Sequence, residues 1–178
     1  GLGSVKPLHF HEDMESAFLT RMAGKLAIAI NNILLLDRLK RQTVKDPLTG
    51  HYNRSYFDLV LMREFDRCKR YQKKLSCIVM CIDYFENLVD TYGREMGELL
   101  LKETGDILGE NCRVSDIVIR YDEAKFFALL PETPRRNAHQ IAERVRKDIE
   151  NRLSPIVSPK SKKITASLGL AAYPGKDA

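Results

Sequence analysis

Carboxylate side chains occur at two places in the chain where they could meet and hold a metal ion. Asp83 directly follows an apolar run, and Asp122 and Glu123 lie between two further apolar runs. Convergent carboxylates can hold Mg²⁺ against phosphate groups, where the metal neutralises charge that develops in a transition state. A metal pair of Asp83 with Asp122 or Glu123 is one interpretation, against which stands the near-ideal octahedral geometry that Mg²⁺ demands. A structural role for Asp83 is the other, and we favour it.

Hydrophobic patterning predicts the elements that position these side chains. Apolar residues at helical spacing predict helices over 57–68, 96–108 and 134–152, and apolar runs predict strands over 75–82, 116–120, 126–130 and 164–172. The two middle strands are close enough in sequence to form a hairpin. Strand, helix, hairpin, helix, strand is a split βαβ order, which predicts an α/β (α+β) fold with helices on one face of a sheet. Asn53 or Ser55 can cap the first helix.

The composition is that of a globular protein. The chain has 178 residues, of which 44% are apolar and 30% charged, with a net charge of +5. Its Lys and Arg residues are spread along the sequence, so we expect no nucleic-acid partner. The four cysteines lack zinc-site spacing, which indicates free thiols in a reducing cytoplasm. No apolar run approaches the roughly 20 residues of a membrane span, so we expect no membrane contact within this chain.

Three stretches carry recognisable motifs. Residues 46–54 read Asp-Pro-Leu-Thr-Gly-His-Tyr-Asn-Arg, residues 120–126 read Arg-Tyr-Asp-Glu-Ala-Lys-Phe, and residues 80–98 run from Met-Cys-Ile-Asp-Tyr-Phe-Glu to Tyr-Gly-Arg-Glu-Met-Gly-Glu. They resemble the GGDEF domains of diguanylate cyclases, which join two GTP molecules into cyclic di-GMP. The resemblance implies a nucleotidyl-cyclase-like central mixed sheet with surrounding helices over residues 45–178, without the usual C-terminal helix.

The resemblance also implies that the first strand and its following helix have lost their chemistry. The metal-binding Asp of the family is replaced by Cys81, the phosphate-contacting Lys by Glu86 and the guanine-reading Asn by Val89. Glu98 keeps the character of the second base-reading acid, and the family equivalent of Asp83 is structural. Glutamate beside a triphosphate repels it, and an unpaired polar group on guanine costs about 1 to 3 kcal/mol.

The hairpin motif departs from the family in the same direction. Asp122 and Glu123 replace two glycines that let the backbone approach a phosphate, and they add bulk and negative charge. Ala124 replaces the metal-binding acid, and Lys125 replaces the acid after it. The sequence therefore predicts a degenerate domain with no cofactor, and Mg²⁺ only if the substitute carboxylates rescue catalysis.

A second site is implied by residues that match the family. Arg113-Val114-Ser115-Asp116 has the spacing and register of the Arg-x-x-Asp site where many GGDEF proteins bind cyclic di-GMP, and Arg144 matches a further ligand-contacting arginine. The planar fork of arginine suits phosphate or a guanine edge, and aspartate can accept from guanine. The alternative is a surface ion pair of Arg113 with Asp116, worth at most about 1 kcal/mol.

The N-terminal part of the chain predicts a signalling helix over 18–43. Its apolar residues follow a 3-4-3-4-3 spacing compatible with a coiled-coil seam, at Leu19, Met22, Leu26, Ala29, Ile33 and Leu36. Residues 1–44 also resemble the end of a GAF sensory domain. Two interpretations stay open: the helix forms a homodimer, or it packs on its own domain.

These observations favour an inactive GGDEF domain in bacterial second-messenger signalling, acting as a cytoplasmic cyclic di-GMP receptor through Arg113, Asp116 and Arg144. One alternative is a dimerisation or relay scaffold that binds no nucleotide but passes a signal to a downstream protein partner. The other alternative is a diguanylate cyclase with atypical metal ligands.

Overall fold

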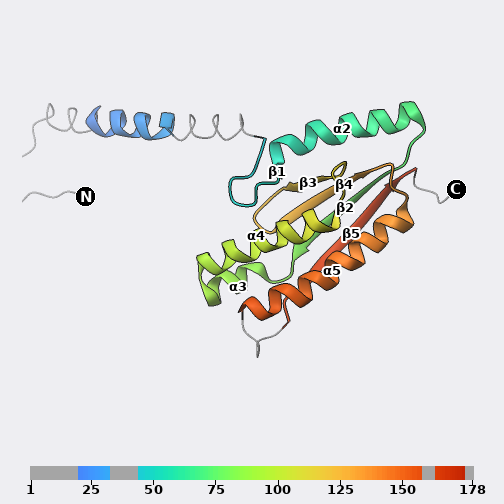
Figure 1. Cartoon of the computed structure of the whole chain (residues 1–178). Helices are drawn as coiled ribbons and strands as arrows, with labels where there is room; N and C mark the ends of the chain where they lie inside the picture. The colour runs from blue at the N-terminus through green and yellow to red at the C-terminus, as the bar shows by residue number, and fades with distance from the viewer. Residues whose placement is uncertain (1–19, 33–43, 158–162, 175–178) are drawn as a thin grey trace, which may run out of the picture. The chain divides into compact units, whose positions relative to one another are not determined.

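A computed structural model describes residues 20–32, 44–157 and 163–174 of the chain (Figure 1). The chain divides into two compact units, Gly1–Thr43 and Val44–Ala178. In the first unit, residues 20–32 form a helix whose apolar side chains Met22, Leu26, Ile28 and Ile30 are exposed. The rest of the predicted helix over 18–43, with Leu19, Ile33 and Leu36, lies outside the described residues. The resemblance of this unit to a GAF domain stays a prediction.

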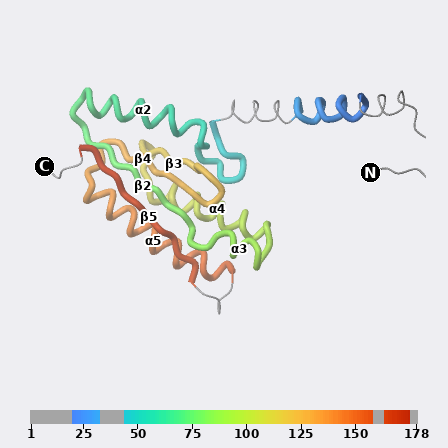
Figure 2. The backbone as a smooth tube through the Cα atoms, turned by 180° about the vertical axis from the view of Figure 1, so that it is seen from behind, coloured from blue at the N-terminus to red at the C-terminus, as the bar shows by residue number. Residues whose placement is uncertain are grey.

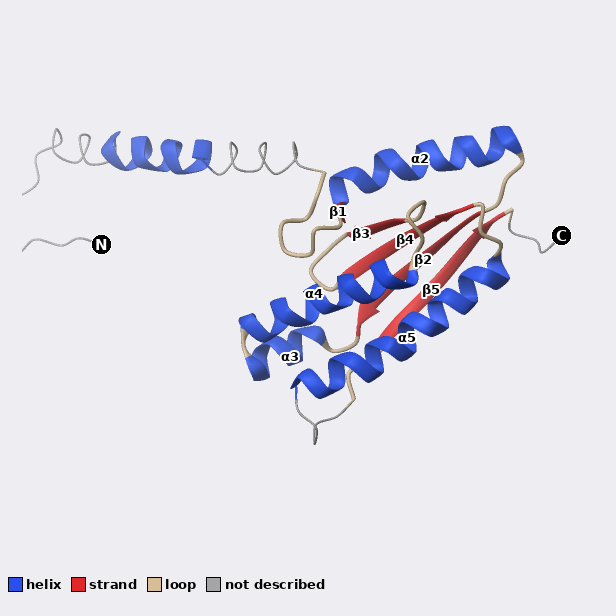
Figure 3. Cartoon of the chain, in the orientation of Figure 1, coloured by secondary structure: helices blue, strands red, loops and turns tan. Residues whose placement is uncertain are grey.

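The second unit is built on one five-stranded mixed sheet in the order β1-β3-β4-β2-β5 (Figure 3). The strands are β1 (Tyr52–Asn53), β2 (Leu75–Ile82), β3 (Ile117–Arg120), β4 (Lys125–Pro131) and β5 (Ala166–Tyr173). β1 runs parallel to β3, and the other neighbours are antiparallel. The predicted α/β architecture with a central mixed sheet and surrounding helices is confirmed.

Four helices accompany this sheet: α2 (Arg54–Tyr71), α3 (Phe85–Tyr92), α4 (Arg94–Asn111) and α5 (Arg135–Val157). Figures 1 and 2 show α2 on one side of the sheet and α4 and α5 on the other. α2 begins at the N-cap Asn53, whose side chain accepts a hydrogen bond from the Tyr56 N–H at 3.2 Å. Asn53 rather than Ser55 is therefore the cap.

The core lies on both faces of the sheet, as alternation along β4 shows. Phe126 and Ala128 face α4 and α5, whereas Leu129 packs with Phe57 and Val60 of α2. Side chains alternate between the two faces of a strand, so a single strand can serve both cores. The expectation of helices on one face only is therefore wrong, because the apolar side of α2 covers the second face.

In the second unit, the predicted strand over 75–82 is confirmed in full, and the other predicted strands and helices appear with shifted ends. Sequence patterning missed α3 and β1. α3 follows the N-cap residue Tyr84, which has a left-handed backbone and makes no side-chain cap, and none of the α3 residues is buried. Its apolar residues do lie at helical spacing, at Phe85, Leu88, Val89 and Tyr92, but its eight residues fall short of the roughly 11 to 18 over which such a pattern predicts a helix.

Two further findings concern the described parts of the chain. None of the helices there is long and apolar enough to cross a membrane. All four cysteines are free thiols, of which Cys68 is buried and the others are partly buried.

Candidate functional site

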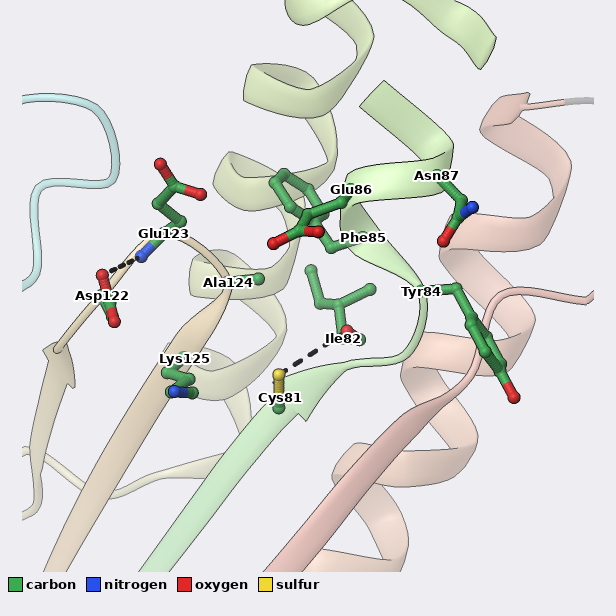
Figure 4. A pocket seen from close by; sticks show the side chains of 10 residues that line it. All are labelled: Cys81, Ile82, Tyr84, Phe85, Glu86, Asn87, Asp122, Glu123, Ala124 and Lys125. Carbon is green, nitrogen blue, oxygen red and sulfur yellow. Dashed lines mark hydrogen bonds between the residues drawn. The ribbon is translucent and has the colours of Figure 1, made fainter. Parts of the chain in front are cut away.

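A cavity of about 310 Å³ lies where the end of β2, the start of α3 and the β3–β4 turn meet (Figure 4). Most of the positions that the sequence predicts to be a degenerate active site line it. Its walls are formed by Cys81, Ile82, Tyr84, Phe85, Glu86, Asn87, Asp122, Glu123, Ala124 and Lys125. The fold therefore brings the two motifs together, although about forty residues separate them in the sequence.

Strand register places a thiol and an ammonium group beside each other in this cavity. Cys81 and Lys125 are direct partners across the antiparallel pair of β2 and β4. The Cys81 thiol donates a weak hydrogen bond to the Ile82 carbonyl at 3.6 Å. A soft thiol and a cation are unsuitable ligands for Mg²⁺, which prefers oxygen.

The hairpin turn is held by its own hydrogen bonds and needs no glycine. The Tyr121 and Asp122 N–H groups donate to the Lys125 carbonyl at 2.9 and 3.3 Å, and the Asp122 carboxylate accepts from the Glu123 N–H at 2.9 Å. Neither Asp122 nor Glu123 has a positive φ. Their side chains therefore fit this turn without backbone strain.

Ala124 has become part of the hydrophobic core. It is 9% exposed and belongs to the cluster that includes Ile82 and Leu101, and its carbonyl accepts from the Ile82 N–H at 3.3 Å. A methyl group at this position offers no ligand to a metal ion, and the backbone carbonyl of Ala124 joins the hairpin to β2.

Asp83 is directed to β5 rather than to the cavity. Its carboxylate oxygens accept hydrogen bonds from the Thr165 and Ser167 hydroxyl groups at 2.6 and 2.7 Å. Asp83 does not line the cavity with Asp122 and Glu123. Within the described residues, no group of three or more His, Cys, Asp or Glu side chains could hold a metal ion. The donor set therefore does not fit Mg²⁺.

The remaining positions of the predicted degenerate site lie on α3 and α4. Glu86 is in the first turn of α3 and lines the cavity. Val89 packs against Gly97 so closely that a Cβ atom at Gly97 would come within 2.7 Å of a Val89 methyl group. Glu98 forms an ion pair with Arg94 at 3.2 Å. The side chains at the two predicted base-reading positions, Val89 and Glu98, thus make a methyl contact and an intrahelical ion pair.

The Arg113–Asp116 stretch forms a turn between α4 and β3. The Arg113 N–H donates to Asp116 Oδ2 at 2.7 Å, and the Asp116 N–H donates to the Arg113 carbonyl at 2.9 Å. Asp116 Oδ1 is buried without a hydrogen-bond partner among the described residues. The Arg113 side chain is exposed, and no described residue pairs with its guanidinium. The predicted surface ion pair of Arg113 with Asp116 is absent from the described contacts.

Arg144 of α5 contacts the last residue of α4, just before this turn. Its Nε donates to Asn111 Oδ1, and its Nη2 donates to the Asn111 carbonyl at 3.1 Å. Burial raises the pKa of Cys112 to about 12, the Asp116 charge adds to the increase, and the Arg144 charge opposes it. Both charges therefore act on Cys112, and the structure gathers Asp116 and Arg144 at one end of α4.

Sequence reasoning missed Asn111, which holds Arg144. Asn111 is the last residue of α4 and is buried. It continues the buried stripe that Leu101, Thr104 and Leu108 begin. A polar residue in phase with an apolar stripe is the signal that could have identified it, since buried polar groups require partners.

Residues 43–178 match the family model described as the GGDEF domain of diguanylate cyclases. The chain belongs to the GGDEF domain family. Diguanylate cyclase A of Treponema denticola is 32% identical over 168 residues, which are 93% of this chain and 44% of that protein. The response regulator PleD of Caulobacter vibrioides is 31% identical over 79% of this chain. This GGDEF chain spans less than half the length of either relative.

Solved structures share the fold of this GGDEF domain. The diguanylate cyclase SiaD of Pseudomonas aeruginosa, solved with its activator SiaC, has a TM-score of 0.67 and 26% identity, covering 89% of this chain and 60% of SiaD. The GGDEF domain of DgcB from Caulobacter crescentus, solved with c-di-GMP, has a TM-score of 0.66 and 24% identity, covering 75% of this chain and 77% of DgcB. At that identity, the likeness to DgcB concerns the fold.

Proposed function

We propose that this GGDEF domain is catalytically inactive and acts in bacterial second-messenger signalling as a receptor for cyclic di-GMP. Arg113, Asp116 and Arg144 would bind the ligand. Membership of the diguanylate cyclase family and the c-di-GMP bound to the similarly folded DgcB domain support this choice of ligand.

The charges around the hairpin cavity support the loss of cyclase activity. Glu86, Asp122 and Glu123 contribute three carboxylates and Lys125 one ammonium group, which gives a formal charge of −2. A triphosphate brought to this cavity meets repulsion, and the residues there do not fit the Mg²⁺ that would offset it. Selective GTP binding and turnover are therefore not expected.

The single observation that carries the receptor proposal is the unpaired oxygen of Asp116. A buried acceptor without a partner costs about 1 to 3 kcal/mol. Asp116 Oδ1 is such an acceptor, and Arg113 beside it has no described partner for its guanidinium. A ligand that carries both N–H donors and phosphate oxygens would satisfy both groups, and cyclic di-GMP has these two features.

Calorimetric titration of the 178-residue chain with cyclic di-GMP tests the receptor proposal. We expect binding by the wild type and a loss of at least tenfold in affinity for Arg113→Ala, since a charged hydrogen bond contributes about 1.5 to 3 kcal/mol. Arg70→Ala is the matched control, because it removes the same charge from an exposed position on α2. No binding by the wild type, or equal affinities for wild type and Arg113→Ala, would refute the proposal.

The same titration in EDTA and in Mg²⁺ should give equal affinities, because none of the three proposed ligand-binding residues requires a metal.

Incubation with GTP and Mg²⁺ or Mn²⁺ tests whether the domain is a diguanylate cyclase with atypical metal ligands. Cyclic di-GMP above the level of a heat-inactivated control would establish turnover and overturn the inactive assignment. A chain that neither binds cyclic di-GMP nor makes it would fit the relay scaffold instead.

Homodimerisation through the first helix is a further part of the proposal. Met22, Leu26 and Ile30 are spaced by four residues, and each is at least half exposed. Two such stripes from two chains could cover each other. Light scattering after size-exclusion chromatography should give a dimer for the wild type and a monomer for Leu26→Asp. A monomeric wild type would contradict this part alone.

A further inference from the structure

The last turn of α4 is tied to α5 by a hydrogen-bond network centred on Asn111. The Asn111 Nδ2 group donates to the Ile107 carbonyl and to Asp148 Oδ2, each at 2.9 Å, and Asn111 Oδ1 accepts from Arg144 Nε. Asn111 is 9% exposed. The amide therefore uses both of its donors and its acceptor within the protein.

These partners fix the orientation of the Asn111 amide. Ile107 and Asp148 present only acceptors, and Arg144 presents only donors. Rotation of the amide by 180° would place its NH₂ group against the guanidinium and its oxygen against the Asp148 carboxylate. The charged partners on its two sides thus exclude the flipped arrangement.

The network also fixes one edge of the Arg144 guanidinium. Nε donates to Asn111 Oδ1, and Nη2 donates to the Asn111 carbonyl at 3.1 Å. Of the five N–H groups of arginine, two are used in this way and three remain. The remaining N–H groups of Nη1 and Nη2 form a fork of the kind that binds phosphate with two parallel hydrogen bonds.

We propose that Asn111, restrained by Asp148, is a positioning residue of the ligand site. It holds the Arg144 guanidinium beside the turn that carries Arg113 and Asp116, with the unused fork available to a phosphate group. Arginine has many rotamers, and a ligand that must immobilise a free side chain binds more weakly than one that meets a fixed side chain. This inference rests on the proposed function, since it concerns affinity for cyclic di-GMP.

A double-mutant cycle by calorimetry tests this role, using wild type, Asn111→Leu, Arg144→Ala and the double variant. Leucine keeps the side-chain volume and removes every polar contact. We expect Asn111→Leu to weaken cyclic di-GMP binding by about 3- to 10-fold. In the Arg144→Ala background, the same substitution should have no further effect, because Asn111 acts only through Arg144.

Arg152→Ala is the matched control, because it removes another α4–α5 contact that does not involve Arg144. Arg152 binds Glu103 Oε1 at 2.8 Å and Glu110 Oε2 at 2.5 Å. This variant should lower thermal stability and leave the affinity unchanged. Asp148→Ala keeps Asn111 but removes its restraint, and it should weaken cyclic di-GMP binding by about 2- to 5-fold, again only when Arg144 is present. This variant replaces Asn111→Leu in the cycle if Asn111→Leu does not fold.

The outcomes separate the two proposals. A wild type that does not bind cyclic di-GMP overturns the receptor function and this inference with it. A wild type that binds, with equal affinity in Asn111→Leu and Asp148→Ala, overturns the positioning role alone. The positioning role also fails if the loss persists in the Arg144→Ala background or if Arg152→Ala weakens binding to the same extent.

Discussion

Replacing Arg120 by alanine should destabilise the domain much more than replacing an exposed arginine. Arg120 Nη1 lies 3.2 Å from both carboxylate oxygens of Asp46, and its Nη2 donates to the Glu123 carbonyl at 3.1 Å. One guanidinium therefore connects the segment before β1 to the hairpin turn. Both Arg120 and Asp46 are only 16% exposed.

The magnitude follows from what Arg120→Ala leaves behind. Asp46 keeps its hydrogen bonds from the Thr49 N–H and hydroxyl at 2.9 and 2.8 Å but loses its only described counter-charge. Removing one partner of a fully buried ion pair costs about 3 to 5 kcal/mol, and partial exposure of this pair lowers the figure. With the lost bond to the turn, we expect a decrease of about 2 to 4 kcal/mol in the free energy of unfolding.

Urea denaturation measures this decrease, with Arg94→Ala as the matched control. Arg94 pairs with Glu98 at the same 3.2 Å distance, but its side chain is 88% exposed. An exposed pair of this kind contributes at most about 0.5 kcal/mol. Equal losses in Arg120→Ala and Arg94→Ala would refute the reasoning, because burial would then make no difference.

The pH dependence of the Arg120→Ala effect provides a second check. Burial raises the pKa of Asp46, but hydrogen bonds from Thr49 and the charge of Arg120 outweigh it, so the pKa lies below its usual 3.8. A lowered carboxyl pKa gives stability that is present above the unfolded value and is lost as pH falls through the folded value. The difference between wild type and variant should stay constant from pH 7 to about pH 4 and shrink below it.

Two further predictions concern packing around α4. Gly97→Ala should lower the free energy of unfolding, measured in urea, by about 1 to 3 kcal/mol, because the new methyl group meets Val89. Adding Val89→Ala should relieve most of that loss. An undiminished loss in the double variant would contradict this packing. Burial lowers the pKa of His51, which packs against Gly105 and Gly109, so its contribution to stability is present above pH 6.5 and is lost below it. The urea midpoint should therefore fall between pH 7 and pH 5 more steeply for the wild type than for His51→Gln, and parallel curves would contradict the assignment.

Local patterns in the sequence were sufficient for most of the fold. The strand over 75–82 is apolar at every position except Ser76, because β2 lies inside the sheet between β4 and β5 and is packed on both faces. β1 has two residues and α3 has eight, so each is too short for its pattern to predict an element. The placement of α2 on the second face of the sheet was also missed, since spacing shows that this helix has an apolar side but not which surface it covers.

The spacing of the proposed ligand-binding residues can be read from the sequence, whereas their long-range contacts cannot. Arg113 and Asp116 follow from their spacing to the hairpin motif. The hydrogen bonds of Asn111 to Arg144 join residues 33 positions apart, and no local pattern specifies them. The direction of Asp83 toward β5 likewise depends on Thr165 and Ser167, more than eighty residues later.

The central claim is that ligand binding occurs at the α4–β3 turn and not at the hairpin cavity. Titration of the ¹⁵N-labelled chain with cyclic di-GMP, followed by amide chemical shifts, tests it most directly. Shifts should concentrate on residues 111–116 and around Arg144, while the amides of residues 81–87 and 122–125 stay unchanged. Shifts confined to the cavity residues, or no shifts at saturating ligand, would contradict the account.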